Sequence, residues 1–252
     1  QMCIRDRSIE VKPSGDGFRP RTRFSNFVNL NELCNLFGEV FDIAKTADMN
    51  LKLPAIQNGK PEMIICEKSP EQELQTDAGI ERARRIEAKM VQPDEDNMLA
   101  VCTYMTKVAL DARILDPEAE EFDGGKVALC ADKIIEINKA QPGTAQAVFC
   151  DTNTPKKDAF SVYQALRDRL VRSGEFAENE IAFVHDAAND KQRLAMFEKV
   201  NNAEIKIIIG STGKLGTGVN IQRKLSALHH IDAPYRPSDI EQRNGRGIRP
   251  VS

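Results

Sequence analysis

The stretch Ile205–Asn220 reads IKIIIGSTGKLGTGVN, and it decides the fold class. Its first five residues include four isoleucines, which is typical of a buried β-strand. A glycine-rich turn follows at once and carries the hydroxyl groups of Ser211, Thr212 and Thr217. Ligands bind beyond the carboxyl ends of parallel strands, and exposed backbone N–H groups in such a turn attract an anion. The stretch therefore predicts a strand that ends at a phosphate-binding turn.

Apolar runs and amphipathic segments alternate on both sides of this stretch. Strands are expected at 147–150, 181–184, 205–209 and 228–231, and helices at 126–138, 155–172, 189–200 and from 238 onward. In the helix at 189–200, the spacing predicts that Leu194, Phe197 and Val200 face the core. Alternating strands and helices predict βαβ units with a parallel sheet, and continuous apolar strands predict helices on both of its faces. The expected fold class is α/β.

The part of the chain before Gly125 has a different texture. Residues up to 23 are polar and interrupted by Pro and Gly, which predicts loop, and the first seven resemble the translation of an adapter used in sequencing libraries. Helices are expected at 29–47, 69–90 and 97–115, with a short strand at 63–66. The acidic run 117–125 favours a solvated linker. We therefore expect a mainly helical segment before the α/β domain.

Charge is unevenly distributed along the 252 residues, whose formal net charge is -3. A mildly acidic chain is not a general polyanion binder, so any nucleic-acid contact must come from a local patch. Residues 203–252 supply one, because they hold four acidic residues against eight basic ones: Lys206, Lys214, Arg223, Lys224, Arg236, Arg243, Arg246 and Arg249. The patch predicts that any nucleic acid binds near the end of the chain.

The cysteines are scattered, and no two have the spacing of a zinc knuckle. Cys150 lies within an apolar run, which favours a buried free thiol. This usage indicates a reducing, cytoplasmic setting. No apolar run approaches the length of a membrane span, and no secretory signal is present, so we expect no membrane association.

The glycine-rich turn does not have the pattern of known nucleotide-binding loops. A P-loop requires Ser or Thr after Gly-Lys, whereas Leu215 follows Lys214. A dinucleotide fingerprint also fails, because Ile221 stands where a third glycine would follow Gly216 and Gly218. The alternative to a phosphate-binding turn is a glycine-rich turn that only connects a strand to a helix.

A second cluster, QRNGRGIR, occupies residues 242–249. On a helix, Arg246 and Arg249 share one face, and Gln242 lies nearly on the same face. Two guanidinium groups beside one amide are suited to clamping phosphate. The alternative is a solvated basic helix. Two glycines within the run argue against that alternative, because each costs about 1 kcal/mol in a helix interior.

These clusters carry a family resemblance. Residues 242–249 resemble the last motif of superfamily II helicases, QxxGRxxR, and residues 211–220 resemble the motif that precedes it. Between them, DAPYRPSD at 232–239 resembles the Asp-x-Pro-aromatic-x-Pro link of Swi/Snf-type enzymes. Order and spacing agree over roughly residues 126–250. The chain also resembles the large helicase–methylase proteins of phages and mobile elements.

The resemblance implies a domain organisation. Residues 125–252 would form the second RecA-like lobe of a helicase, with a parallel sheet flanked by helices. Residues 24–124 would form the end of the first lobe and a helical inter-lobe segment, and residues 1–23 would be disordered or artefactual. The chain would be a fragment cut at both ends, and its partners would be the first lobe of the same polypeptide and DNA, with RNA not excluded. Its setting would be the cytoplasm of a bacterial or phage-infected cell.

The resemblance also implies a role for each motif residue. Arg246 and Arg249 would be catalytic arginine fingers on the γ-phosphate. Gln242, Gly216 and Gly218 would lie near ATP, and the nucleic-acid contacts would be Ser211, Thr212, Gly213, Lys214, Thr217 and Asn220. ATP and Mg²⁺ would be held mainly by the first lobe. Since the sequence contains neither a P-loop nor an acidic metal motif, this chain is not expected to hydrolyse ATP alone.

Two other functions remain open on the residues. One is a catalytically inert RecA-like module that binds nucleic acid or protein. The other is an unrelated doubly wound enzyme that uses the glycine-rich turn for its own phosphate. His185 suggests a nucleophile or a metal ligand, but the chain has only three histidines and no HExxH pattern. We expect no metal site.

Overall fold

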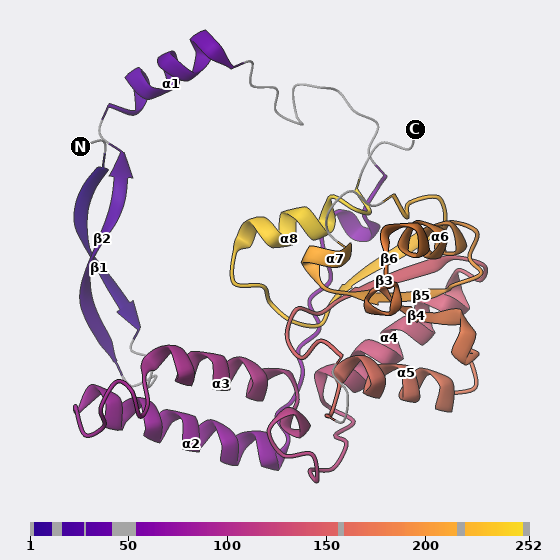
Figure 1. Cartoon of the computed structure of the whole chain (residues 1–252), viewed down its shortest axis with the longest axis horizontal. Helices are drawn as coiled ribbons and strands as arrows, with labels where there is room; N and C mark the ends of the chain where they lie inside the picture. The colour runs from indigo at the N-terminus through magenta and orange to yellow at the C-terminus, as the bar shows by residue number, and fades with distance from the viewer. Residues whose placement is uncertain are drawn as a thin grey trace. The chain divides into compact units, whose positions relative to one another are not determined.

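The computed structural model describes residues 3–11, 17–27, 29–41, 54–155, 159–215 and 220–248 (Figure 1). The chain divides into two compact units. The first comprises Gln1–Lys52 and Ala78–Cys102, and the second comprises Leu53–Asp77 and Thr103–Ser252. The parallel sheet and both predicted motif clusters belong to the second unit.

The second unit is built on a four-stranded parallel sheet. Its strands are β3 (Ala145–Phe149), β4 (Ile181–Phe183), β5 (Ile207–Gly210) and β6 (Leu225–His230), in the spatial order β4-β5-β3-β6. All four predicted strands are present within a few residues of their expected positions. The predicted α/β class with a parallel sheet is confirmed.

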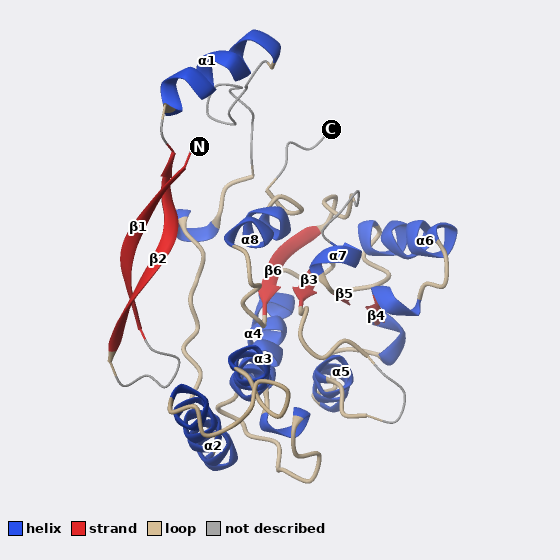
Figure 2. Cartoon of the chain, turned by 60° about the vertical axis from the view of Figure 1, so that its left-hand side comes forward, coloured by secondary structure: helices blue, strands red, loops and turns tan. Residues whose placement is uncertain are grey.

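Helices cover both faces of this sheet, as Figure 2 shows. Along β5, Ile207 and Ile209 pack on one face and Ile208 on the other, because successive strand residues point in opposite directions. The first face is covered by α4 (Lys126–Ala140) and α5 (Val162–Arg172), and the second by α6 (Asp190–Asn201) and α7 (Thr212–Leu215). The apolar strand therefore reflects two hydrophobic cores, one on each side.

In helix α6 (Asp190–Asn201), one of the three residues predicted to face the core is exposed. Phe197 and Val200 are buried at 4% and 0% exposure, as expected, but Leu194 is 62% exposed. The first two turns of α6 are mostly exposed, and its first buried residue is Phe197. The helical period alone does not show where along a helix the cover of the sheet begins.

Two further expectations, a strand at 63–66 and a solvated linker at 117–125, are wrong. Residues 60–68 form no strand, and Met63 and Ile65 are 88% and 86% exposed. The acidic run is not a free linker, because the Glu121 carboxylate accepts hydrogen bonds from Arg169 at 2.9 Å and Arg172 at 3.2 Å. Asp123 also accepts from Arg169, at 2.8 Å. These ion pairs hold the run against α5.

Helix α2 (Pro70–Glu87) begins where the sequence predicts. The Ser69 hydroxyl accepts a hydrogen bond from the Gln72 backbone N–H at 3.1 Å, and the Gln72 side chain accepts one from the Ser69 N–H at 3.0 Å. This reciprocal pair is a capping box, which satisfies two N–H groups that a helix leaves open. The next helix, α3 (Met98–Leu110), ends in a 3-10 turn at Ala112–Ile114.

The first unit contains an antiparallel hairpin of β1 (Cys3–Val11) and β2 (Phe18–Phe27), visible as a long twisted ribbon in Figure 1. The expectation of loop up to residue 23 is therefore wrong for the described residues. Helix α1 (Leu30–Val40) confirms the core of the helix predicted at 29–47, whose remaining residues after 41 lie outside the described ones. Within the described part of the chain, no helix has the length and apolar character needed to cross a membrane.

Candidate functional site

The carboxyl ends of three strands converge on one buried arginine, Arg243, in α8 (Pro237–Asn244). Its side chain is 0% exposed. The guanidinium donates from Nε to the Thr212 hydroxyl at 2.7 Å and from Nη1 to the Asp232 carbonyl oxygen at 3.1 Å. Nη2 donates to the carboxylates of Asp151 at 2.7 Å and Asp232 at 3.1 Å. We call Asp151, Thr212, Asp232 and Arg243 the Arg243 network.

Thr212 joins the glycine-rich segment to this network. Its backbone N–H and its hydroxyl both donate to the Asp151 carboxylate, each at 2.6 Å. Thr212 is 8% exposed, so its polar groups are satisfied inside the protein. The expectation that Thr212 contacts nucleic acid stays a prediction, and the structure gives Thr212 an internal role, in which it fixes the start of α7.

Asp232 closes the network from β6. It is 7% exposed, and its Oδ2 accepts hydrogen bonds from the backbone N–H groups of Asp151 and Thr152, each at 2.7 Å. The buried guanidinium therefore faces two carboxylates whose remaining oxygens are also bonded. A buried charge without such partners would be strongly destabilising.

Opposing effects act on the pKa of Asp151. Burial alone would raise it, but the two hydrogen bonds from Thr212 and the contact with Arg243 outweigh burial and lower the pKa below its usual value. The carboxylate therefore stays ionised at neutral pH, as the buried cation beside it requires. Its side chain is 35% exposed, so solvent reaches this member of the network.

The predicted arginine-finger cluster is arranged differently from the expected helical face. Helix α8 ends at Asn244, and Arg246 lies in the following turn, where its N–H donates to the Arg243 carbonyl oxygen at 3.0 Å. Arg246 is 5% exposed and Gln242 is half-buried. Arg249 lies outside the described residues.

The close packing around Gly247 leaves little room for a side chain. A Cβ at this position would lie 3.0 Å from the Leu228 Cδ1 atom of β6 and 3.5 Å from the Leu225 Cδ2 atom. The turn that carries Arg246 therefore lies close against the sheet. Glycine in this cluster thus serves backbone packing, which the sequence argument against a plain basic helix did not foresee.

The glycine-rich segment presents part of its surface to solvent. Gly213 and Lys214 are exposed and Ser211 is half-buried, all directly after the carboxyl end of β5, and Asn220 is also exposed. The Asn220 carbonyl oxygen accepts a hydrogen bond from the Asn201 side chain at 2.9 Å, which ties the segment to α6. The remaining predicted residues, Gly216, Thr217 and Gly218, lie outside the described residues.

The basic patch is smaller than the sequence indicates. Arg243 and Arg246 are buried, and Lys206 forms an ion pair with Glu180 at 2.7 Å. The exposed cations of the patch include Lys214 and Arg236. A smaller group of residues is thus available for phosphate contacts.

The three histidines lie near the sheet and have lowered pKa values. Burial and the charge of Lys214 lower the pKa of His185, whose ring meets Tyr163 edge-on at 5.4 Å. Burial also lowers the pKa of His229, to about 4, and its ring bonds the Gln146 side chain at 2.8 Å. No group of three or more His, Cys, Asp or Glu side chains placed to hold a metal ion occurs among the described residues.

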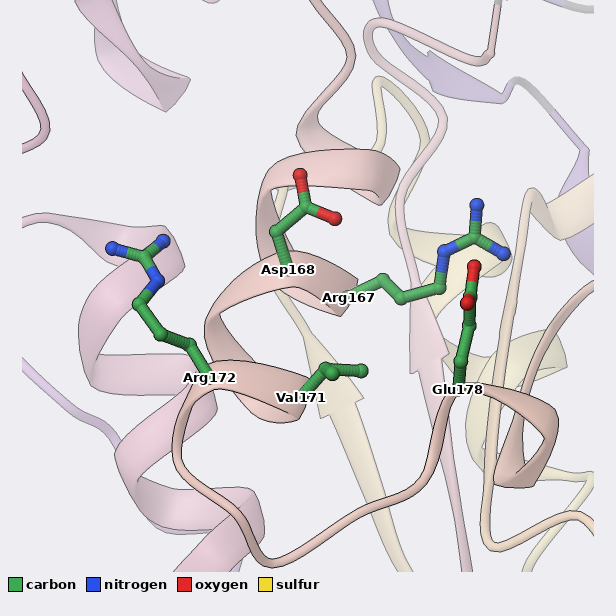
Figure 3. Close-up of a pocket in the computed structure, with 5 residues that line it drawn as sticks. All are labelled: Arg167, Asp168, Val171, Arg172 and Glu178. Atoms are coloured by element: carbon green, nitrogen blue, oxygen red, sulfur yellow. The ribbon is translucent and has the colours of Figure 1, made fainter.

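A depression of about 300 Å³ lies away from this edge, along α5 (Figure 3). It is lined by Arg167, Asp168, Val171, Arg172 and Glu178. Arg167 and Glu178 point toward each other across it, so opposite charges already face one another there. None of its lining residues belongs to the predicted site.

Three members of the Arg243 network, Asp151, Asp232 and Arg243, were not predicted from the sequence as site residues. Arg243 was counted only as part of the surface patch. One signal was available, because Asp151 and Asp232 each follow an apolar strand and parallel strands end at the same edge. Which basic residue would lie between them was not readable from spacing.

The sequence of the α/β domain matches one known protein family. Residues 126–251, half of the chain, match the model of the helicase conserved C-terminal domain. The match begins at the first residue of α4 and includes the whole sheet and both motif clusters. No curated protein matches the chain. By this match, the chain belongs to the helicase conserved C-terminal domain family.

Proposed function

We propose that this chain provides the second motor lobe of an ATP-dependent DNA helicase or translocase of the Swi/Snf type. The observation that carries the proposal is the family match over residues 126–251. It is supported by the exposed segment beyond β5, which lies at the edge where parallel sheets bind ligands. RNA is the alternative substrate.

In this proposal, nucleic acid binds at the glycine-rich segment. Gly213 and Lys214 are exposed and follow the half-buried Ser211, and Asn220 is exposed at the far end of the segment, where its carbonyl oxygen bonds the Asn201 side chain of α6. Backbone N–H groups, a hydroxyl and one ammonium group suit contact with phosphates, which positions a strand without reading its sequence. Thr212 holds the segment from inside through Asp151.

ATP is proposed to meet this lobe at the turn after α8. Guanidinium and amide N–H groups are donors, so they suit the oxygens of a triphosphate and cannot ligate a metal ion. Arg246, Arg249 and Gln242 would therefore face phosphate, while the first lobe holds Mg²⁺. Bound ATP supplies the cleavable phosphoanhydride. Because Arg246 is buried here, the proposal requires its side chain to turn outward when the ATP-bearing lobe closes on this edge.

The test is Arg246→Ala in the full-length protein. Loss of a finger that stabilises transition-state charge lowers the rate by roughly 10³-fold or more, so DNA-stimulated ATP hydrolysis should nearly vanish while the DNA dissociation constant stays unchanged. Arg172→Ala is the matched control, because it removes an ion-paired arginine from α5. ATP hydrolysis at the wild-type rate in Arg246→Ala would show that the finger assignment is wrong.

A second candidate is a catalytically inert RecA-like module that binds nucleic acid or protein. The burial of Arg246 favours it, because a finger must reach a phosphate outside its own lobe. The two candidates differ in one measurement. A full-length protein that binds DNA but shows no DNA-stimulated ATP hydrolysis would support the inert module.

A further inference from the structure

We propose that Arg243 is a positioning residue that transmits nucleic-acid contact at residues 211–215 to the turn carrying Arg246. The inference rests on the proposed function, since it assigns a regulatory link between the two proposed contact regions. It concerns a residue that neither the motif spacing nor the family match assigns a role.

The first step is the link between Thr212 and the exposed part of its segment. Gly213 and Lys214 are exposed and directly follow Thr212, which is fixed by two hydrogen bonds of 2.6 Å to Asp151. The Thr212 hydroxyl also accepts the Arg243 Nε–H at 2.7 Å. A phosphate that pulls on Gly213 or Lys214 therefore shifts an atom to which Arg243 is bonded.

The second step runs from Arg243 to Arg246. The Arg246 N–H donates to the Arg243 carbonyl oxygen at 3.0 Å, so the turn begins on the residue that carries the buried guanidinium. Gly247 lies close against Leu228 of β6, which leaves the turn little room to move independently of the sheet. The position of the Arg243 backbone thus sets that of Arg246.

The third step is energetic. Replacing a buried ion pair by well-packed apolar groups often costs no stability, so such a pair is weak evidence for a purely stabilising role. What the planar guanidinium adds is geometry, because its donors fix Thr212, Asp151 and Asp232 in one arrangement. Asp151 is partly exposed, so the arrangement is open to change from the ligand side.

The test is hydrogen exchange of the 252-residue chain with and without single-stranded DNA. Coupling between two sites is commonly worth 5- to 150-fold, so DNA should slow exchange by about tenfold both at residues 211–215 and at residues 244–248. In Arg243→Lys, the compact ammonium group lacks the planar fork of donors that reaches Thr212, Asp151 and Asp232 at once. The slowing at 211–215 should then remain while the slowing at 244–248 disappears.

Two further variants keep the test decisive. Asp151→Asn removes the charge opposite Arg243 but keeps the side-chain shape, and it should also uncouple the two segments. If Arg243→Lys disturbs the sheet, faster exchange of the β3 and β5 amides will show it. The result for Asp151→Asn then tests the role of Arg243 in its place. Arg172→Lys, an ion-paired arginine on α5, is the control and should respond to DNA as the wild type does.

The outcomes separate the two proposals. If DNA slows exchange at 211–215 but not at 244–248 in the wild type, or if both variants keep the wild-type response, the transmitting role of Arg243 is refuted and the proposed function stands. If DNA slows exchange at neither segment of the wild type, the proposed nucleic-acid contact fails, and the inference fails with it.

Discussion

At the residue scale, the chemistry of the site depends on which charges are buried. Arg243 and Lys214 look alike in sequence, since both are basic residues beside a glycine-containing motif. In the structure Arg243 is 0% exposed between two carboxylates, whereas Lys214 is exposed. The same formal charge is thus held in a buried ion-paired network in one case and exposed to solvent in the other. Only the surroundings distinguish them.

His229 allows a prediction at this scale. Burial lowers its pKa from 6.5 to about 4, so between these values the unfolded chain binds a proton more readily than the folded chain does. The stability contributed by the neutral ring is complete above 6.5 and is lost as the pH falls toward 4. The variant His229→Gln keeps a donor for Gln146. Between about pH 7.5 and about pH 5, its free energy of unfolding should fall less than that of the wild type, by on the order of 2 kcal/mol.

Urea unfolding of both proteins at the two pH values measures this difference. Burial also lowers the pKa values of His185 and His230, so some acid sensitivity should remain in the variant. An equal loss of stability in wild type and variant would show that His229 is not the main pH-sensitive group.

At the element scale, periodicity predicts most elements but not their surroundings. The four strands and the helices α2, α4 and α6 are predicted within a few residues, because a buried strand and an amphipathic helix each carry a local pattern. The short helix α7 was expected as a turn, since four residues are too few to show a helical period. The strand expected at 63–66 fails because an apolar run becomes a strand only when another strand pairs with it.

Gly247 allows a prediction about how α8 is joined to the sheet. In Gly247→Ala, the new Cβ would lie 3.0 Å from Leu228 Cδ1, and overpacking of this kind costs about 1–3 kcal/mol. The lower entropy of the unfolded chain returns about 0.4–1 kcal/mol, so a net loss of about 1 kcal/mol is expected. Urea unfolding at neutral pH measures it.

Two matched variants isolate the cause. Gly213→Ala meets no atom within 4 Å, so it should not be destabilised. In a Leu228→Val background, the cost of Gly247→Ala should shrink, because the facing side chain is shorter. If the cost is the same in both backgrounds, contact with Leu228 is not its source.

At the scale of the whole molecule, the charge available for nucleic acid is less than the sequence count. Eight basic residues follow residue 202, but two of them are buried and Lys206 is paired with Glu180. Exposed cations of this region include Lys214, Lys224 and Arg236. Folding thus removes three of the eight basic residues from the apparent patch.

This count predicts a salt dependence. Each neutralised phosphate of duplex DNA contributes a slope of about -0.9 to log K against log salt, so about three contacts give a slope near -3. Fluorescence anisotropy of labelled DNA with this chain measures the slope. Lys214→Gln should make it shallower by about 1. A slope near -7, or one that Lys214→Gln leaves unchanged, would contradict the smaller patch.

The α/β class, the order of strands and helices within the α/β domain, and the family resemblance could all be predicted from the sequence, because strand and helix periods and motif spacing are local properties of the chain. The meeting of Asp151, Thr212 and Asp232 around Arg243 and the burial of Arg246 became visible only in the folded structure. These residues are far apart in sequence. They meet because parallel strands deliver their carboxyl ends to one edge, and a buried guanidinium there is stable only if acceptors from several strands surround it.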